Sequence, residues 1–247
     1  MIREARRQKS LPAVDVPDIC ILDPDGDIVR RLKAEGRAER FEGWPCYHTD
    51  LYTFPLGNEV VGILGCAVGA PFAVLVAEEL FACGCRTLIS LTSAGQIVPL
   101  ENPPYFVVID RALRDEGTSL HYAPPDQFAP ADPHIVTLAS DALNKMGLRA
   151  VVGSSWTTDA PFRETAAAVE AAHAKGILAV EMEAAALYTF ARSQGVAVLC
   201  LAHVTNTMGQ SEGDFEKGEA DGTAAALVIL ETITIALRSN AKRWLAT

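Results

Sequence analysis

Residues 180–196 read VEMEAAALYTFARSQGV and decide the fold of this chain. Two acids, Glu181 and Glu183, precede an alanine-rich segment that ends at Gly195. Residues 177–182 predict a strand, on which positions two apart face the same way, and the alanine-rich segment predicts a helix that Gly195 stops. Both acids therefore lie where a strand ends and a helix begins, which is where open α/β sheets bind ligands. Spacing alone leaves a second interpretation open, in which Glu183 is an ordinary acid in a first helical turn.

Strands and helices alternate on both sides of this stretch. Strands are predicted at residues 19–22, 47–54, 60–65, 87–91, 105–110, 150–157 and 197–205, and helices at residues 28–38, 72–82, 134–146, 161–175 and 214–237. This pattern predicts one α/β domain with a mostly parallel, partly mixed central sheet and helices on both faces. Residues 47–65 add an antiparallel pair. Residues 111–133 contain four prolines and form a loop too long for a mere connector, which is typical of a segment that covers a site.

Length, composition and charge bound the function. With 49% apolar and 21% charged residues, the chain of 247 residues can bury a large core in one domain. We predict an N-terminal tail at residues 1–17 and a single domain at residues 18–240. The net charge of −10 argues against a nucleic-acid-binding surface, which needs clustered lysine and arginine. The basic cluster at residues 3–9 has no apolar region behind it, so a flexible tail is favoured over a signal peptide.

A membrane span has to be considered at residues 60–77, which contain no charged side chain. Three glycines and Pro71 interrupt this run, so we predict a buried strand, a turn and a helix in a cytoplasmic protein without membrane contact. The six cysteines offer no matched ligand pairs, and Cys20, Cys66 and Cys200 lie in apolar runs typical of buried reduced thiols. We therefore expect neither a metal nor an organic cofactor.

Five segments, taken in order, resemble the nucleoside phosphorylase superfamily and, within it, the uridine phosphorylase branch. They are CAVGAP with the helix after it at residues 66–80, RTLISLTSAGQI at residues 86–97, DEGTSLHY at residues 115–122, TDAPFRE at residues 158–164 and AVEMEAAA at residues 179–186. The resemblance implies the nucleoside phosphorylase-like fold and cleavage of the N-glycosidic bond of a nucleoside. It also implies a homo-oligomer, a dimer or hexamer, in which a neighbour completes each site.

Carried over residue by residue, the resemblance implies a site for the sugar. Met182 and Glu183 hold the ribose, and Glu181 assists through the 2′-hydroxyl. Ser93 and Gly95 match positions beside the attacking group. Cleavage of an N-glycosidic bond gives the sugar cationic character in the transition state, so a nearby carboxylate favours the reaction.

The resemblance also implies residues that recognise the base. Phe162, or Trp156 nearby, stacks on the base, and Arg163 hydrogen-bonds a pyrimidine carbonyl. His121 lies in the segment that resembles an active-site loop, although a plain surface histidine fits its surroundings equally well. Asn206 stands where purine-specific relatives carry an acid, and an amide cannot protonate a departing base. A uridine-like nucleoside is therefore expected.

The arginines with which the family holds phosphate are missing at their expected positions, although Arg30 qualifies for the first if the helix after the turn starts two residues later. The turn at residues 22–28 keeps Asp-Pro-Asp without the arginine that follows it, and Ser90 stands where a second arginine is expected. The segment that includes His48 resembles the place of a third and has none. The candidates left to hold phosphate are Ser93, Gly69, Arg30 and His48.

Three functions follow from these matches and departures. The first is phosphorolysis of a pyrimidine nucleoside to base and ribose 1-phosphate, with phosphate as co-substrate. The second is hydrolysis by a nucleosidase that uses water, which explains the missing arginines. The third is nucleoside binding without turnover. The retained sugar-binding acids favour an enzyme over a binding protein, and the family favours phosphate over water as the nucleophile.

Overall fold

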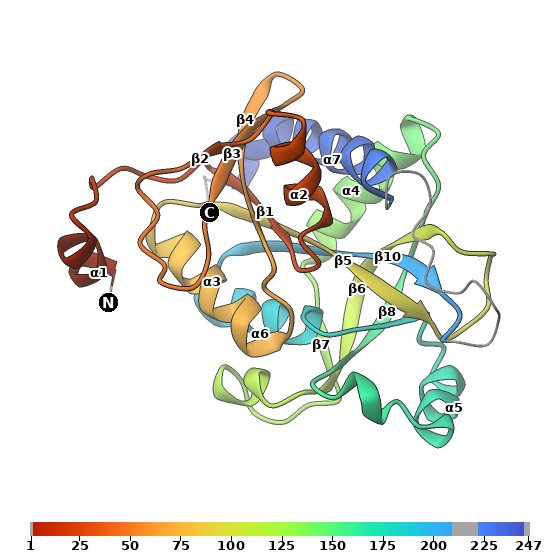
Figure 1. Ribbon diagram of the computed structural model, residues 1–247. Helices are drawn as coiled ribbons and strands as arrows, with labels where there is room; N and C mark the ends of the chain where they lie inside the picture. The colour runs from red at the N-terminus through yellow and green to blue at the C-terminus, as the bar shows by residue number, and fades with distance from the viewer. Residues whose placement is uncertain (1, 209–221, 245–247) are drawn as a thin grey trace.

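A ten-stranded mixed sheet forms the centre of the protein in the computed structural model, which describes residues 2–208 and 222–244. Its strands are β1 (Ile19–Asp23), β2 (Glu39–Arg40), β3 (Tyr52–Leu56), β4 (Glu59–Gly65), β5 (Thr87–Gln96), β6 (Tyr105–Asp115), β7 (Phe128–Pro130), β8 (Ala150–Thr158), β9 (Ala179–Glu181) and β10 (Ala197–Asn206). The helices are α1 (Ile2–Lys9), α2 (Asp27–Ala34), α3 (Ala70–Ala82), α4 (Pro133–Lys145), α5 (Ala166–Ala174), α6 (Ala184–Gln194) and α7 (Thr223–Trp244), with short 3₁₀ helices η1 (Thr118–His121) and η2 (Pro161–Arg163). Figure 1 shows this alternation, which confirms the predicted α/β class.

Five strands close on themselves instead of forming an open sheet. β5 pairs with β10, β10 with β6, β6 with β8, β8 with β9, and β9 again with β5. β1, β4, β3 and β2 continue outward from β5 as an open extension. The chain reverses along residues 97–104 between β5 and β6, which lie on either side of β10. Consequently β10 runs parallel to β5 and antiparallel to β6.

The mixed character predicted for the sheet is confirmed. The predicted antiparallel pair is β3 with β4, in the register Thr53 opposite Gly62. Further antiparallel pairs join β5 to β9 and β6 to β7, so the antiparallel share exceeds the N-terminal pair alone. Alternating strands and helices identify the crossover connections, but short strands such as β7 and β9 leave little periodic signal.

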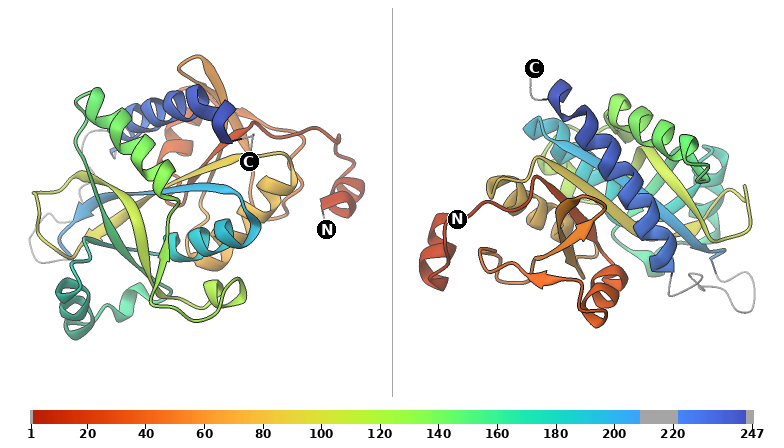
Figure 2. Two further views of the ribbon diagram at one scale, coloured as in Figure 1. Left: turned by 180° about the vertical axis from the view of Figure 1, so that it is seen from behind. Right: turned by 90° about the horizontal axis from the view of Figure 1, so that it is seen from above.

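Helices cover both faces of the sheet, as predicted (Figure 2). α7 packs against α4 and α2 on one face, and α3 packs against α6 on the other. The eight residues from Ala184 to Ala191 in α6 are all buried, between α3 and the strands β6 and β10. The three alanines at the start of α6 let its backbone lie close to the sheet.

One helix among the described residues is long and apolar enough to cross a membrane by length and composition alone. It is the stretch Thr223–Asn240 of α7, of which 44% is buried inside the protein. Its packing against α4 and α2 is that of a core helix. The uncharged run at residues 60–77 forms β4, a turn and α3, as the sequence predicts.

The N-terminal segment and one predicted helix differ from expectation. Residues 2–9, expected as a flexible tail, form α1, where Lys9 Nζ donates to the Cys46 carbonyl at 2.5 Å. The helix predicted at residues 161–175 is divided into η2 and α5. α5 begins at Ala166 because Thr165 is extended and its side-chain oxygen accepts a hydrogen bond from the Ala168 N–H.

Two long segments need adjusted bounds. The loop predicted at residues 111–133 contains the end of β6, η1 and β7. The helix predicted at residues 214–237 begins outside the described residues, and its described part belongs to α7.

The buried cysteines are largely as expected, with one correction. All six thiols are free, and Cys20 and Cys200 are buried. Cys66 is exposed, because the chain leaves β4 at this residue with a φ of 61° and turns toward α3.

Tyr188 ties α6 to the closed ring of strands. Its hydroxyl donates to the Ile109 carbonyl of β6 at 2.7 Å and accepts from the Cys200 N–H of β10 at 2.9 Å. Tyr188→Phe leaves both buried backbone groups without this partner, so we expect the free energy of unfolding to fall by about 1–3 kcal/mol in urea denaturation. The matched control is Tyr47→Phe, which removes an exposed hydroxyl bonded to Gln8 and should change stability by less than about 0.5 kcal/mol. If the two variants were equally stable, the hydrogen bonds of Tyr188 would not stabilise the contact between α6 and the strands.

Candidate functional site

Four chain segments meet at the end of the sheet where β1 and β5 finish. They are the turn after β1, the end of β5, the turn before α3, and the junction between β9 and α6. Hydrogen bonds join them in pairs: the Gly69 N–H donates to Glu183, and Ser93 donates to Asp25. The predicted strand-to-helix junction with its two acids therefore lies at a shared edge of the sheet.

Glu183 is a buried carboxyl with one oxygen in use. It is 1% exposed, and its Oε1 accepts from the Gly69 N–H at 2.7 Å. Its Oε2 is buried and accepts no hydrogen bond within the described part of the chain. Burial, followed by the charge of Glu181, raises the pKa of Glu183 to about 8. The Gly69 N–H and the Thr92 hydroxyl lower this pKa by smaller amounts. Glu183 thus keeps a buried polar atom that a ligand's hydroxyl group can use.

The backbone conformation of Gly69 allows it to donate a hydrogen bond to this carboxyl group. Its φ of 92° is a conformation that favours glycine, and it directs the backbone N–H at Glu183 just before α3 begins. The same N–H was a candidate for holding phosphate. In the described structure this donor is occupied by Glu183.

Glu181 has a different role from Glu183, although the two are only two residues apart. Its Oε1 accepts from the hydroxyls of Ser155 and Thr157 at 2.9 and 2.5 Å. Its Oε2 accepts from the backbone N–H groups of Glu183 and Ala184, both at 2.7 Å. Four donors fill the acceptor positions of the carboxylate, so the expected contact with a 2′-hydroxyl is not supported. Glu181 positions the start of α6.

Asp25 joins the site through Ser93. The Ser93 N–H donates to one carboxylate oxygen at 2.9 Å, and the Ser93 hydroxyl donates to the other at 3.0 Å. The sequence analysis considered the Asp-Pro-Asp turn only for its missing arginine and did not select Asp25. The available signal was the second acid of that turn, two residues after the buried strand β1 ends.

Asp23 performs the capping role in the same turn. It is 2% exposed and accepts from the N–H groups of Gly26 and Val29 at 3.1 and 2.9 Å. Burial raises the pKa of Asp23 to about 7, with further contributions from Asp25 and Asp27. The edge of the sheet is therefore rich in carboxyl groups.

Gly95 and Asn206 lie together at the ends of β5 and β10. A Cβ on Gly95 would lie 2.3 Å from the flexible Met208 Sδ and 3.2 Å from Val180 Cγ1, so Met208 would have to move to accommodate a side chain there. Asn206 is buried, its Oδ1 accepts from the Met208 N–H at 3.0 Å, and its Nδ2 donates to the Ala94 carbonyl and the Thr205 hydroxyl. In this structure the amide of Asn206 holds its own strand end.

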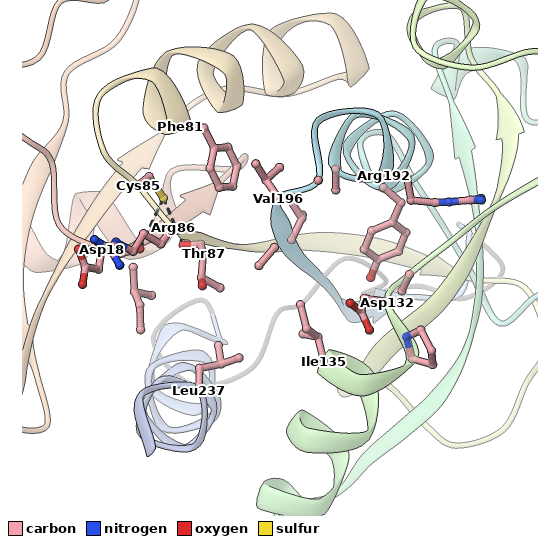
Figure 3. A pocket seen from close by; sticks show the side chains of 18 of the residues that line it. Asp18, Phe81, Cys85, Arg86, Thr87, Asp132, Ile135, Arg192, Val196 and Leu237 are labelled. Atoms are coloured by element: carbon pink, nitrogen blue, oxygen red, sulfur yellow. Dashed lines mark hydrogen bonds and ion pairs between the residues drawn. The ribbon is translucent and has the colours of Figure 1, made fainter. Parts of the chain in front are cut away.

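A cavity of about 860 Å³ lies at the other end of the strands. It is lined by the first residues of β5 and β10, including Thr87 and Ala197, and by Gly195 after α6. Figure 3 shows Phe81, Val196 and Leu237 around it. None of the predicted site residues line this cavity, so we place the candidate site at the carboxylate edge, where the chemistry lies.

Comparison with known proteins assigns the chain to a family. A family model described as "Phosphorylase superfamily" matches residues 18–237. The chain belongs to the phosphorylase superfamily. Uridine phosphorylase of Salmonella typhimurium is 28% identical over 171 residues, which cover 64% of this chain and 68% of that protein. A DeoD-type purine nucleoside phosphorylase of Bacillus thuringiensis is 30% identical over 182 residues, covering 71% and 77% respectively.

The solved structures support the same fold. A crystal structure of purine nucleoside phosphorylase from Toxoplasma gondii, in complex with immucillin-H, has a TM-score of 0.78 at 18% identity and covers 95% of both chains. The predicted superfamily and its fold are thus confirmed. Relatives named for uridine and for purine nucleosides both match this phosphorylase superfamily member, so the family does not decide the base.

Phe162, Arg163 and His121, expected at the base, are exposed in the single chain, and none of them hydrogen-bonds Glu183 among the described residues. The Phe162 side chain is fully exposed in η2, and Arg163 beside it is also exposed. His121 is exposed in η1, which packs against α3 and α6. Met182 is half-buried between the two acids, and Trp156 is buried with its indole N–H donating to Asp115.

The candidate cations lie at the rim of the site. Arg30 is exposed in α2, paired with Asp27, and donates to the Asp25 carbonyl at 3.0 Å. His48 is exposed, and its ring meets Phe72 edge-on with centroids 6.4 Å apart. Neither candidate contacts Ser93 through a hydrogen bond among the residues described.

The different roles of the two acids can be tested by stability. The Glu181 carboxylate accepts hydrogen bonds from four donors. In Glu181→Gln the amide has one oxygen to accept them and an NH₂ group that cannot, so some of the four donors lose their partner. We expect the free energy of unfolding to fall by about 2–3 kcal/mol in urea denaturation followed by circular dichroism. The control is Glu170→Gln on the exposed face of α5, expected within about 0.5 kcal/mol of the unsubstituted protein. A Glu181→Gln protein of unchanged stability would show that Glu181 does not hold α6.

Proposed function

We propose that the protein cleaves the N-glycosidic bond of a nucleoside and that Glu183 holds the ribose. The observation that supports this is the buried Oε2 of Glu183, which accepts no hydrogen bond within the described residues. Ribose hydroxyls are donors of the kind this oxygen lacks, and a charge-assisted bond contributes about 1.5–3 kcal/mol. The ionised carboxylate would also stabilise the positive charge that develops on the sugar as the bond to the base breaks.

Phosphate is the first candidate for the nucleophile. The support is membership of the phosphorylase superfamily and the names of the relatives, uridine and purine nucleoside phosphorylase. In phosphorolysis an oxygen of phosphate bonds to C1′ while the C1′–N bond breaks. The base leaves with the electron pair and takes a proton, giving ribose 1-phosphate. No further cofactor is part of the proposal.

Water is the second candidate, favoured by two observations in the site. The two donors of Ser93 are both engaged by the Asp25 carboxylate. Arg30 is engaged by Asp27 and by a backbone carbonyl. Hydrolysis needs neither the Ser93 donors nor a cation for a phosphate dianion.

The proposal includes a uridine-like pyrimidine nucleoside. Asn206 supports it, because the amide at the end of β10 cannot donate a proton to a departing purine as a carboxylic acid can. The proposal also includes a homo-oligomer in the cytoplasm. In one chain Phe162 and Arg163 are exposed, so a neighbouring copy would complete the base side, and six free thiols fit a reducing compartment.

A nucleoside panel tests substrate and nucleophile together. Uridine, cytidine, inosine and adenosine are incubated with the protein, with and without phosphate, and released base is measured by chromatography. We expect uridine to be cleaved at least about 10-fold faster than adenosine, because Asn206, where purine-specific relatives carry an acid, cannot protonate a departing purine. Faster cleavage of adenosine would overturn the pyrimidine assignment. Calorimetric binding of a nucleoside without any base release would support the third function, a binding protein.

The pH dependence tests Glu183. In the free enzyme kcat/KM should rise as pH increases through about 8, the raised pKa of Glu183, because the ionised form stabilises the cationic sugar. Glu183→Gln should lower kcat/KM by about 100-fold and remove this rise. A pH profile unchanged by Glu183→Gln would exclude this role.

The stability of the same variant separates lost activity from lost folding. The pKa of Glu183 is about 8 in the folded protein against an ordinary value of 4.5, so its contribution to stability is complete below 4.5 and is lost as pH rises through about 8. Glu183→Gln lacks this loss. We expect its melting temperature to exceed that of the unsubstituted protein at pH values above 8 and to approach it at acidic pH.

A further inference from the structure

We propose that Asp25 is a specificity-determining residue that keeps phosphate out of the site and leaves water as the nucleophile. The inference rests on the proposed function, because it concerns the group that attacks the nucleoside. It decides between the two candidate nucleophiles named above.

The geometry of Asp25 is that of an internal anion in an anion site. A backbone N–H and a hydroxyl converge from Ser93, a donor pair suited to an oxyanion. The two oxygens of the Asp25 carboxylate take both donors, at 2.9 and 3.0 Å. Ser93 lies at the end of β5, one strand away from β9, which leads to Glu183. An incoming phosphate would have to displace the carboxylate to use these donors.

The charge of Asp25 extends to the other acids of the site. Burial is the main cause of the raised pKa of Glu183 and of Asp23, and the charge of Asp25 adds a smaller increase to the pKa of each, so Asp25 lies within charge range of both carboxyl groups. A phosphate dianion placed beside them would meet repulsion from the same groups. Water is neutral and small, and it meets no such repulsion.

Within residues 2–208 and 222–244, neither Ser90 nor Arg30 supplies Ser93 with a cationic hydrogen-bond partner. Ser90, where the family resemblance calls for an arginine, is 1% exposed, and its hydroxyl has no partner among the described residues. Arg30 pairs with Asp27 at the first turn of α2, and its Nη1 lies 4.0 Å from the Cys66 thiol. In this turn Arg30 is therefore paired with Asp27, and the Asp25 carboxylate occupies the two donors of Ser93.

The reaction that follows is hydrolysis. The water oxygen bonds to C1′ as the C1′–N bond breaks, and the electron pair of that bond goes to the base. The water loses one proton and the base gains one, so the products are free ribose and the neutral base. No phosphate is consumed and no oxidant or reductant is needed.

Three variants test the assignment. Asp25→Ala empties the carboxylate position, whereas Asp25→Asn keeps an acceptor for the Ser93 N–H and removes only the charge. Asp141→Asn, on the exposed side of α4, removes one negative charge elsewhere and serves as the control. Phosphate binding is measured by isothermal titration with inorganic phosphate, and base release from uridine is measured over a phosphate series.

We expect base release by the unsubstituted protein to be independent of phosphate and to give free ribose. Asp25→Ala should bind phosphate at least about 10-fold more tightly than the unsubstituted protein, with Asp25→Asn between them and Asp141→Asn unchanged. Base release by Asp25→Ala should then increase with phosphate and give ribose 1-phosphate.

Equal phosphate affinity of all four proteins, or strict phosphate dependence of the unsubstituted protein, would overturn the inference. If no protein releases base from any nucleoside, the proposed function fails, and the phosphate titration still decides whether Asp25 excludes phosphate. If Asp25→Ala does not fold, the titration of Asp25→Asn decides it, because that variant preserves the size of the side chain.

Discussion

The hydrogen bonding of the buried Glu181 carboxylate is the constraint on which the site depends. An ionised group without water is costly unless donors surround it, and here two hydroxyls of β8 and two N–H groups of the β9–α6 junction do so. Thr157 contributes twice, because its hydroxyl oxygen also accepts from the Ala185 N–H. The Thr157 side chain therefore joins β8 of the closed ring both to Glu181 and to the first turn of α6.

The position of Glu183 follows from this arrangement. β9 ends at Glu181, so the strand alternation that would align the two acids stops before Glu183. The backbone N–H of Glu183 is held by Glu181, and its side chain turns to Gly69. One acid is consumed by the fold, and the next retains an unused oxygen. Two carboxyl groups only two residues apart thus acquire different chemistry from their donors.

Local patterns in the sequence predict much of this fold, and long-range pairing accounts for the rest. The alternation of strands and helices, the strand-to-helix junction at Glu181 and the superfamily are visible in single stretches of sequence. The closed ring is not, because it depends on β10 lying between β5 and β6 and on the short β9 joining β5 to β8. The division of the helix after Pro161 depends on the cap at Thr165, which spacing of apolar residues does not report.

The site residues show the same limit. Glu183 and Gly69 were identified as separate motifs, but only the structure shows that one hydrogen bond joins them. The full exposure of Phe162 and the saturation of Glu181 are also properties of three-dimensional neighbours. Asp25 was missed because an Asp-Pro-Asp turn has a sufficient local explanation as a cap, and Asp23 does provide one.

The distribution of charge gives the site a consistent chemical preference. Burial raises the pKa of Asp23 and of Glu183, and the charge of Asp25 adds a smaller increase to the pKa of each. A sugar that becomes cationic as its base departs is stabilised by such an environment, and most strongly when Glu183 is ionised. A phosphate dianion is destabilised by it unless cations intervene, and Arg30 is paired with Asp27. In the proposal that Asp25 excludes phosphate, the carboxylates that favour breaking the glycosidic bond also disfavour phosphate as the attacking group.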